Sequence, residues 1–159
     1  MTRKRLYHDV GGLATLQRVH KIFYDKIYAH DWLKDFFKNH DQALIERQQS
    51  AFMSGVMGGP DVYVGKPPKY THQHMYITAA LFEVRQGLLR DALVEAGVSA
   101  AHTEQWLKLD GAFKKVIVNH SLQAFHEIYT HKQRIIVDPP PGVRISRELN
   151  INHQGDVEK

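Results

Sequence analysis

Residues 39–60 read NHDQALIERQQSAFMSGVMGGP, and this stretch contains a whole helix with both of its ends. Asn39 is a candidate N-cap, with Gln42 three residues later as the partner of a capping box. One helical face carries four residues, namely Ile45, Gln49, Phe52 and Val56. Gly58-Gly59-Pro60 ends the helix, because glycine closes a helix readily and proline cannot continue one.

The same helical spacing continues on both sides of this stretch. After a turn at Gly11-Gly12, residues 16–27 carry a stripe of Leu16, Val19, His20, Phe23, Tyr24 and Ile27. A second stripe begins at Thr78 and closes at Gly97, through Leu81, Phe82, Arg85, Leu88, Leu89, Ala92 and Leu93. A last helix, capped by Ser99 or Thr103, is expected to run past Tyr129 along Trp106, Leu109, Phe113, Val116, Ile117, His120, Ala124 and Ile128. With only a short helical segment near 70–76 between them, these stripes predict an all-α fold.

The C-terminal part of the chain has a different character. Residues 135–142 read IIVDPPPG, and three prolines exclude a helix there because they lack a backbone donor and fix φ. We therefore expect a helical domain over residues 1–134 and an extended tail over 135–159, either flexible or laid along a surface.

Composition excludes several classes of protein. The chain has 159 residues, no cysteine and eleven histidines, so a metal site must use nitrogen or oxygen ligands. The net charge is +4, but basic and acidic residues are interspersed apart from Arg3-Lys4-Arg5, which argues against nucleic-acid binding. No apolar run approaches the roughly 20 residues of a membrane span, and no apolar signal core follows the N-terminus. We expect a cytoplasmic protein.

Polar residues interrupt the apolar stripes at Tyr24, Gln49, Arg85 and His120. Each of them, taken alone, can be satisfied by backbone, water or a neighbouring side chain. Three on successive long helices favour a polar-lined cavity inside an otherwise apolar core. His72 and His74 form a His-x-His pair, but as a zinc site this pair has no third ligand at a recognisable spacing.

The order of the motifs resembles that of the truncated haemoglobins, the short two-over-two globins. The resemblance covers about residues 7–130 and rests on Val10-Gly-Gly-Leu13, Phe23-Tyr24, Leu33-x-x-Phe36-Phe37, Arg47-Gln-Gln49 with Phe52, Gly58-Gly-Pro-x-x-Tyr63-x-Gly65, His72, Ile77-Thr78, Phe82 and Ala96-Gly-Val98. Phe37, Tyr24 and Gln49 together are most similar to the first group of this family.

The resemblance implies a haem b cofactor and a role for each matching residue. His72 matches the proximal histidine that ligates the haem iron. Tyr24 and Gln49 match distal residues that hydrogen-bond a bound ligand, whereas Ile45 occupies the usual distal position and cannot donate. The other implied haem contacts are Phe37, which stacks on the porphyrin, Phe52, Ile77, Phe82 and Val116 in the apolar walls, and Tyr63 and Lys69 near the propionates.

Arg85 departs from the family pattern. The second and third groups carry tryptophan at this position, and the first group normally carries a small apolar residue. Three roles stay open for Arg85: stabilising a bound anion in the distal pocket, pairing with a propionate, or reaching solvent from the edge of the stripe.

The resemblance implies binding of dioxygen and other diatomic ligands such as nitric oxide. Two distal donors predict slow release, which suits oxygen storage or nitric oxide dioxygenation with a separate reductase as partner. We expect the sixth iron position to be empty or bound by water, with His40 as the nearest internal alternative. The alternative interpretation of the same stripes belongs to another functional class: a cofactor-free helical module for protein interaction or regulation.

Overall fold

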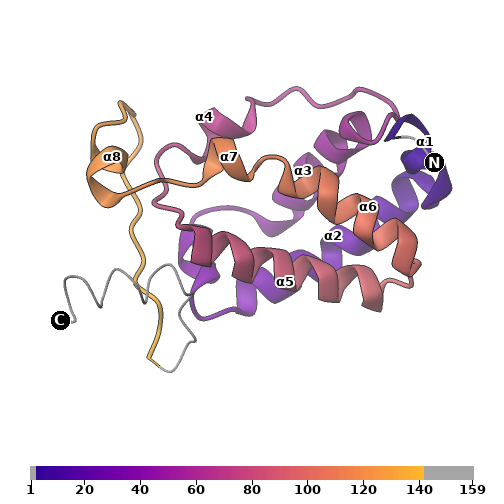
Figure 1. Ribbon diagram of the computed structural model, residues 1–159, viewed down its shortest axis with the longest axis horizontal. Helices are drawn as coiled ribbons and strands as arrows, with labels where there is room; N and C mark the ends of the chain where they lie inside the picture. Colours follow the sequence, from indigo (N-terminus) through magenta and orange to yellow (C-terminus); the bar gives the residue numbers. More distant parts are fainter. Residues whose placement is uncertain (1–2, 142–159) are drawn as a thin grey trace.

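The computed structural model describes residues 3–141, and Figure 1 shows its elements in chain order. The elements are α1 (Arg3–Asp9), α2 (Gly12–Ala29), the 3₁₀ helix η1 (Leu33–Phe36), α3 (Gln42–Val56), α4 (Pro68–His72), α5 (Ala79–Glu95), α6 (Ala100–Gly111), α7 (Lys114–Ile117) and α8 (Leu122–His126). Extended pairing in the described range is limited to one isolated parallel bridge between Met75 and Ile135. The all-α class is thus confirmed.

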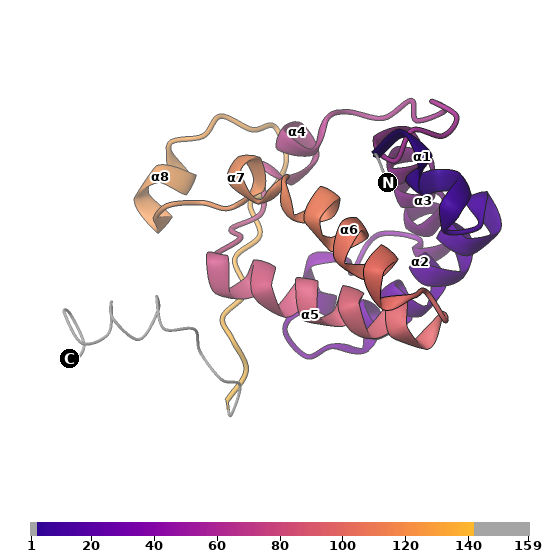
Figure 2. The ribbon, with the colours of Figure 1, turned by 45° about the vertical axis from the view of Figure 1, so that its right-hand side comes forward.

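Four long helices pack as two pairs. Helix α2 contacts both α3 and α5, and α5 in turn contacts α6. Figures 1 and 2 show α5 and α6 together on one side of the molecule, with α2 and α3 behind or beside them. This is the expected two-over-two arrangement. Within residues 3–141, no helix is long and apolar enough to cross a membrane.

Side-chain N-caps start four of the helices, α3, α5, α6 and α8. Thr78 accepts a hydrogen bond from the Leu81 N–H at 3.1 Å at the start of α5. Ser99, one of the two expected caps of the next helix, accepts one from the His102 N–H at 3.2 Å. The predicted N-cap of α3 is wrong. Asp41, not Asn39, caps this helix, since its carboxylate accepts from the Leu44 N–H at 3.0 Å.

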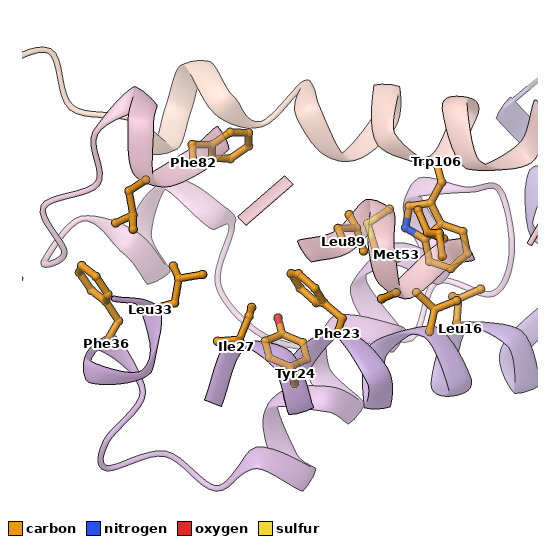
Figure 3. Close-up of a cluster of buried hydrophobic side chains, with 14 of the residues drawn as sticks. Leu16, Phe23, Tyr24, Ile27, Leu33, Phe36, Met53, Phe82, Leu89 and Trp106 are labelled. Carbon is orange, nitrogen blue, oxygen red and sulfur yellow. The ribbon is translucent and has the colours of Figure 1, made fainter. Parts of the chain in front are cut away.

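The core lies between the helix pairs and is built mainly on one face of α2. Leu16, Val19 and Phe23 are fully buried there, and they meet Met53 of α3 and Trp106 of α6. Figure 3 shows this cluster, with Trp106 reaching down between the helices. Burial of each large apolar side chain stabilises the fold by about 1.5–3 kcal/mol.

The predicted long last helix is wrong, because the chain forms α6 and then two short helices, α7 and α8, in its place. Helix α6 ends at Gly111, and α7 covers only Lys114–Ile117. Asn119 then pairs with Ile77 at the approach to α5: its side-chain oxygen accepts from the Ile77 N–H, and its own N–H donates to the Ile77 carbonyl, each at 2.8 Å. His120 follows in an exposed bend outside any helix, so it is not on a buried stripe.

Residues 135–137 run in an extended conformation over the segment that follows α4. The Ile135 N–H donates to the His74 carbonyl at 2.9 Å, and the Tyr76 N–H donates to the Ile135 carbonyl at 2.9 Å. The Trp32 indole N–H donates to the Val137 carbonyl at 3.0 Å. We call residues 135–137 the strap. The part of the predicted tail over residues 142–159 lies outside the described residues.

Candidate functional site

A cavity of about 450 Å³ opens between the helix pairs. Its walls come from α2, η1, α3, α4, α5, the end of α6 with Asp110, and the turn into α7. Ten of the predicted site residues line it: Tyr24, Phe37, Ile45, Gln49, Phe52, Tyr63, His72, Ile77, Phe82 and Arg85. In Figure 3 the Tyr24 hydroxyl, from α2, is directed toward the space below Phe82, which comes from α5.

His72 is the last residue of the short helix α4, and its imidazole has a defined tautomer. Its Nδ1 lies 2.8 Å from the Pro68 carbonyl oxygen. Since a carbonyl only accepts, Nδ1 must carry the proton and donate, which leaves the lone pair on Nε2. The Thr71 hydroxyl donates to the same carbonyl at 3.1 Å and its oxygen lies 3.0 Å from Nδ1.

Burial is the main cause that lowers the pKa of His72, although its bond to Pro68 acts in the opposite direction. The ring is therefore neutral at neutral pH. A neutral imidazole with a free Nε2, whose other nitrogen is held by a backbone carbonyl, is the usual form of a histidine metal ligand.

Tyr24 and Gln49 bring two unpaired polar groups to the cavity. Neither side chain makes a hydrogen bond within the part of the chain that the structure describes, and both line the cavity. The Tyr24 ring is held edge-on by Phe23 at 4.8 Å and Phe37 at 6.1 Å between centroids. Burial raises the pKa of the Tyr24 hydroxyl above its usual value, so it stays protonated and able to donate.

Arg85 lies in the cavity wall and is paired with Asp110 of α6. Its Nη1 and Nη2 donate to the two Asp110 oxygens, the second at 3.0 Å, and Nη1 also donates to Gln86 Oε1 at 2.7 Å. The guanidinium lies 5.2 Å from the ring centroid of Phe23 and 5.5 Å from that of Phe82. The Asp110 side chain is only 5% exposed, against 23% for Arg85.

Asp110 was not predicted as a site residue from the sequence. A signal was present, because Thr103, Trp106 and Asp110 are spaced three and four residues apart and form the buried face of α6. From the sequence, Leu109 was expected on that face instead. A buried arginine also requires an acidic partner, and Asp110 supplies it.

Two of the predicted contacts are not part of the cavity lining. Lys69 is exposed and lies over the Tyr70 ring, outside the cavity lining. Val116 is 43% exposed and does not line the cavity, whereas Phe113 and Ile117 do. The turn that separates α6 from α7 changes the helical register, so a single stripe cannot be continued from Trp106 to Val116.

Several lining residues were not predicted as cofactor contacts. Lys66 and Lys132 bring positive charge to the cavity, and His40 and His74 line it as well. Lys132 lies beyond the α8 helix, where a helix was expected and no site residue was sought. His74 is buried, and its Nδ1 has no hydrogen-bond partner within residues 3–141. No group of three metal-binding side chains occurs in that range, so the alternative of a His72–His74 zinc site lacks support.

These residues fit a haem. The cavity is mostly apolar, as a porphyrin requires, and one neutral imidazole nitrogen is free to ligate a metal. Tyr24 and Gln49 bring to the same cavity polar groups that make no hydrogen bond within residues 3–141, so both can pair with a bound ligand. Lys66 and Lys132 can complement carboxylate groups.

Comparison with known proteins agrees with this geometry. A model of the "Bacterial-like globin" family matches residues 5–119. The group 1 truncated haemoglobin of Mycolicibacterium paratuberculosis is 36% identical over 93 residues, which cover 58% of this chain and 68% of the relative. That of Tetrahymena pyriformis is 32% identical over 96 residues, covering 60% and 79%.

Solved structures give the same result. The Fe(III) form of Tetrahymena pyriformis truncated haemoglobin superposes with a TM-score of 0.68 at 29% identity, covering 72% of this chain and 97% of that one. The 2/2 haemoglobin of a Synechococcus species, in the cyanomet state with covalently attached haem, gives 0.63 at 26%, covering 76% and 94%. These matches leave the cofactor-free module without support. The chain belongs to the bacterial-like globin family, as a group 1 truncated haemoglobin, and is a haem-binding, ligand-binding protein.

Proposed function

We propose that the protein binds dioxygen and other diatomic ligands at a haem b whose iron is ligated by His72, with Tyr24 and Gln49 as hydrogen-bond donors to the ligand. The observation that carries this proposal is the presence of two unpaired polar side chains in the cavity that His72 also lines. Ile45 lines the same cavity and has no donor, so hydrogen bonding to the ligand depends on Tyr24 and Gln49.

The haem supplies the metal bond to the ligand, and the protein supplies orientation and polarity. The Pro68 carbonyl fixes the His72 ring and directs the Nε2 lone pair away from α4. Phe37, Phe52 and Phe82 form apolar walls that exclude water, which makes each hydrogen bond in the cavity stronger than it is in water.

Two donors would slow the release of bound dioxygen. Each contributes roughly 1–1.5 kcal/mol, which corresponds to about a tenfold slower dissociation per donor. Slow release suits oxygen storage, or dioxygenation of nitric oxide to nitrate, better than it suits transport. Residues 3–141 form one helical domain with neither a flavin nor a nicotinamide fold, so dioxygenase turnover would use a separate reductase.

The test is the oxygen dissociation rate, measured by stopped flow on Tyr24→Phe and Gln49→Leu. We expect each variant to release oxygen about tenfold faster than the unmodified protein. Tyr28→Phe is a matched control on the same helix, since the Tyr28 hydroxyl donates to the His40 carbonyl and does not line the cavity. Unchanged rates in both cavity variants would refute the assignment of the distal donors.

Consumption of nitric oxide, with nitrate measured as product and a reductase supplied, separates the two functions. Sustained nitrate formation over many turnovers supports dioxygenase activity. A single stoichiometric burst that does not recover when reductase is present supports storage.

A further inference from the structure

We propose that Arg85, held in place by Asp110, is the residue that makes the same cavity favour a small monovalent anion at the haem iron over a neutral diatomic ligand. The inference rests on the proposed haem site and on His72 as its ligand. It concerns a class of ligand distinct from the neutral diatomic gases.

The first step is that the Arg85 guanidinium is fixed. A buried carboxylate from α6 holds two of its nitrogens, and the rings of Phe23 and Phe82 lie within 5.5 Å of it. A charged group that is held on several sides loses little conformational freedom when it binds a ligand. Such a group therefore binds an anion with a smaller entropy cost than a flexible cation on the surface.

The second step is that Arg85 has donors left over. A guanidinium has five N–H groups, and the hydrogen bonds to Asp110 and Gln86 use three of them. The Nε–H and one Nη2–H are without a hydrogen bond within residues 3–141. Because 23% of the Arg85 side chain is exposed while the residue lines the cavity, open space is available beside it for a ligand.

The third step is that Arg85 lies within electrostatic reach of the proposed ligand donors. Burial has the largest effect on the pKa of the Tyr24 hydroxyl and raises it. The positive charge of Arg85 has the next largest effect and lowers this pKa, and the negative charge of Asp110 raises it. The charges of both Arg85 and Asp110 therefore act on the Tyr24 hydroxyl. An anion beside the Tyr24 hydroxyl would meet a neutral donor and a cation together.

The propionates of the haem are a competing partner for Arg85. Lys66 and Lys132 already bring positive charge to the cavity, and both are on exposed segments suited to groups that stay in contact with water. Arg85 instead lies against Phe23, which is fully buried. The position of Arg85 among buried rings therefore favours contact with the ligand of the iron over pairing with a propionate.

The experiment measures azide binding to the ferric haem protein from the shift of its Soret band, with carbon monoxide binding to the ferrous protein as the neutral reference. Arg85→Met alone would leave the buried Asp110 carboxylate unpaired, so the test variant is Arg85→Met/Asp110→Asn, which removes both charges. The control is Arg90→Met/Glu104→Gln, which neutralises an exposed arginine–glutamate pair between the same two helices.

We expect the ratio of azide affinity to carbon monoxide affinity to fall about tenfold or more in the cavity double variant and to stay unchanged in the control. Asp110→Asn, which leaves the Arg85 charge uncompensated, should raise the same ratio. An unchanged ratio in the cavity double variant would overturn the proposal. So would equal weakening of both ligands, which indicates a structural role, or faster haemin loss at a constant ratio, which indicates propionate pairing.

The two proposals fail separately. Failure of the distal-donor proposal would appear as unchanged oxygen release in Tyr24→Phe and Gln49→Leu, whereas the anion proposal depends on the affinity ratio in the charge variants. A preparation that takes up no haemin at all would refute both.

Discussion

At the scale of single residues, the buried His20 is a polar group that the fold keeps neutral. It lies in the core on α2, and its Nδ1 is 2.8 Å from the Ser50 hydroxyl oxygen of α3. Trp106 of α6 packs edge-on against the ring at 5.9 Å between centroids. Burial, followed by the Arg85 charge on α5, lowers the pKa of His20 to about 3.

This shift predicts acid lability. Between the ordinary histidine pKa of 6.5 and about 3, the unfolded chain binds a proton at this residue and the native chain does not. The free energy of unfolding should therefore fall as the pH drops below 6.5, by about 1.4 kcal/mol per pH unit from this residue. His20→Gln should reduce the difference in stability between pH 7 and pH 5, measured by urea denaturation.

His102→Gln is the matched control for this prediction, because the His102 side chain makes no hydrogen bond within residues 3–141. It should leave the pH dependence unchanged. An equal pH dependence in His20→Gln and the unmodified protein would show that His20 does not titrate on unfolding.

Single residues were predictable where a side chain faces the cavity from a regular helix. Tyr24, Gln49 and Arg85 could be selected because polar residues interrupt apolar stripes, and all three line the cavity. Asp110 was missed because its face of α6 also carries apolar neighbours, and the stripe was followed through Leu109. The pairing of Arg85 with Asp110 joins residues 25 positions apart, which no local pattern encodes.

At the scale of elements, helices with strong caps were predicted well and the end of the chain was not. Gly97, whose φ of 84° suits glycine, comes two residues after the end of α5 at Glu95, and the helix starts directly after Thr78. By contrast, apolar spacing continues through residues 112–128 although the chain turns twice there. The contact between Asn119 and Ile77 is tertiary, so it overrides a helical pattern that is locally consistent.

The strap is an element outside the family match, which ends at residue 119. Its hydrogen bonds join the segment directly after His72 to the end of the described chain, through His74 and Tyr76. Trp32, at the start of η1, fixes the strap from the other side through Val137. The strap therefore restrains both the segment that follows His72 and the connection between α2 and α3.

Breaking the strap should loosen haem retention. Ile135→Pro removes the N–H that donates to the His74 carbonyl, and we expect it to lower the free energy of unfolding by about 1–2 kcal/mol and to speed haemin transfer to apomyoglobin. Ile136→Pro is the neighbouring control, because the Ile136 side chain is exposed and its N–H makes no backbone hydrogen bond in the described range. Equal haemin transfer rates in the two variants would show that the strap does not support the His72 segment.

At the scale of the whole molecule, a cavity of about 450 Å³ in a chain of 159 residues makes stability depend on its ligand. The walls are contributed by most of the elements, so a group that fills the cavity bridges both helix pairs. Binding to the native state alone stabilises by about 2.7 kcal/mol when free haemin is at 100 times its dissociation constant. For a domain of this size that corresponds to a rise of roughly 5–10 °C in the midpoint of thermal unfolding.

We therefore expect haemin to raise the unfolding midpoint of the apoprotein by at least this amount, measured by circular dichroism at increasing haemin concentration. His72→Ala should remove most of the rise in the unfolding midpoint, because the metal bond to Nε2 is lost while the apolar walls remain. His126→Ala is the comparison, since His126 is exposed and lies on α8, away from the cavity lining. If haemin stabilised His72→Ala and His126→Ala equally, His72 would not be the ligand of the haem iron and the apolar walls alone would account for the binding.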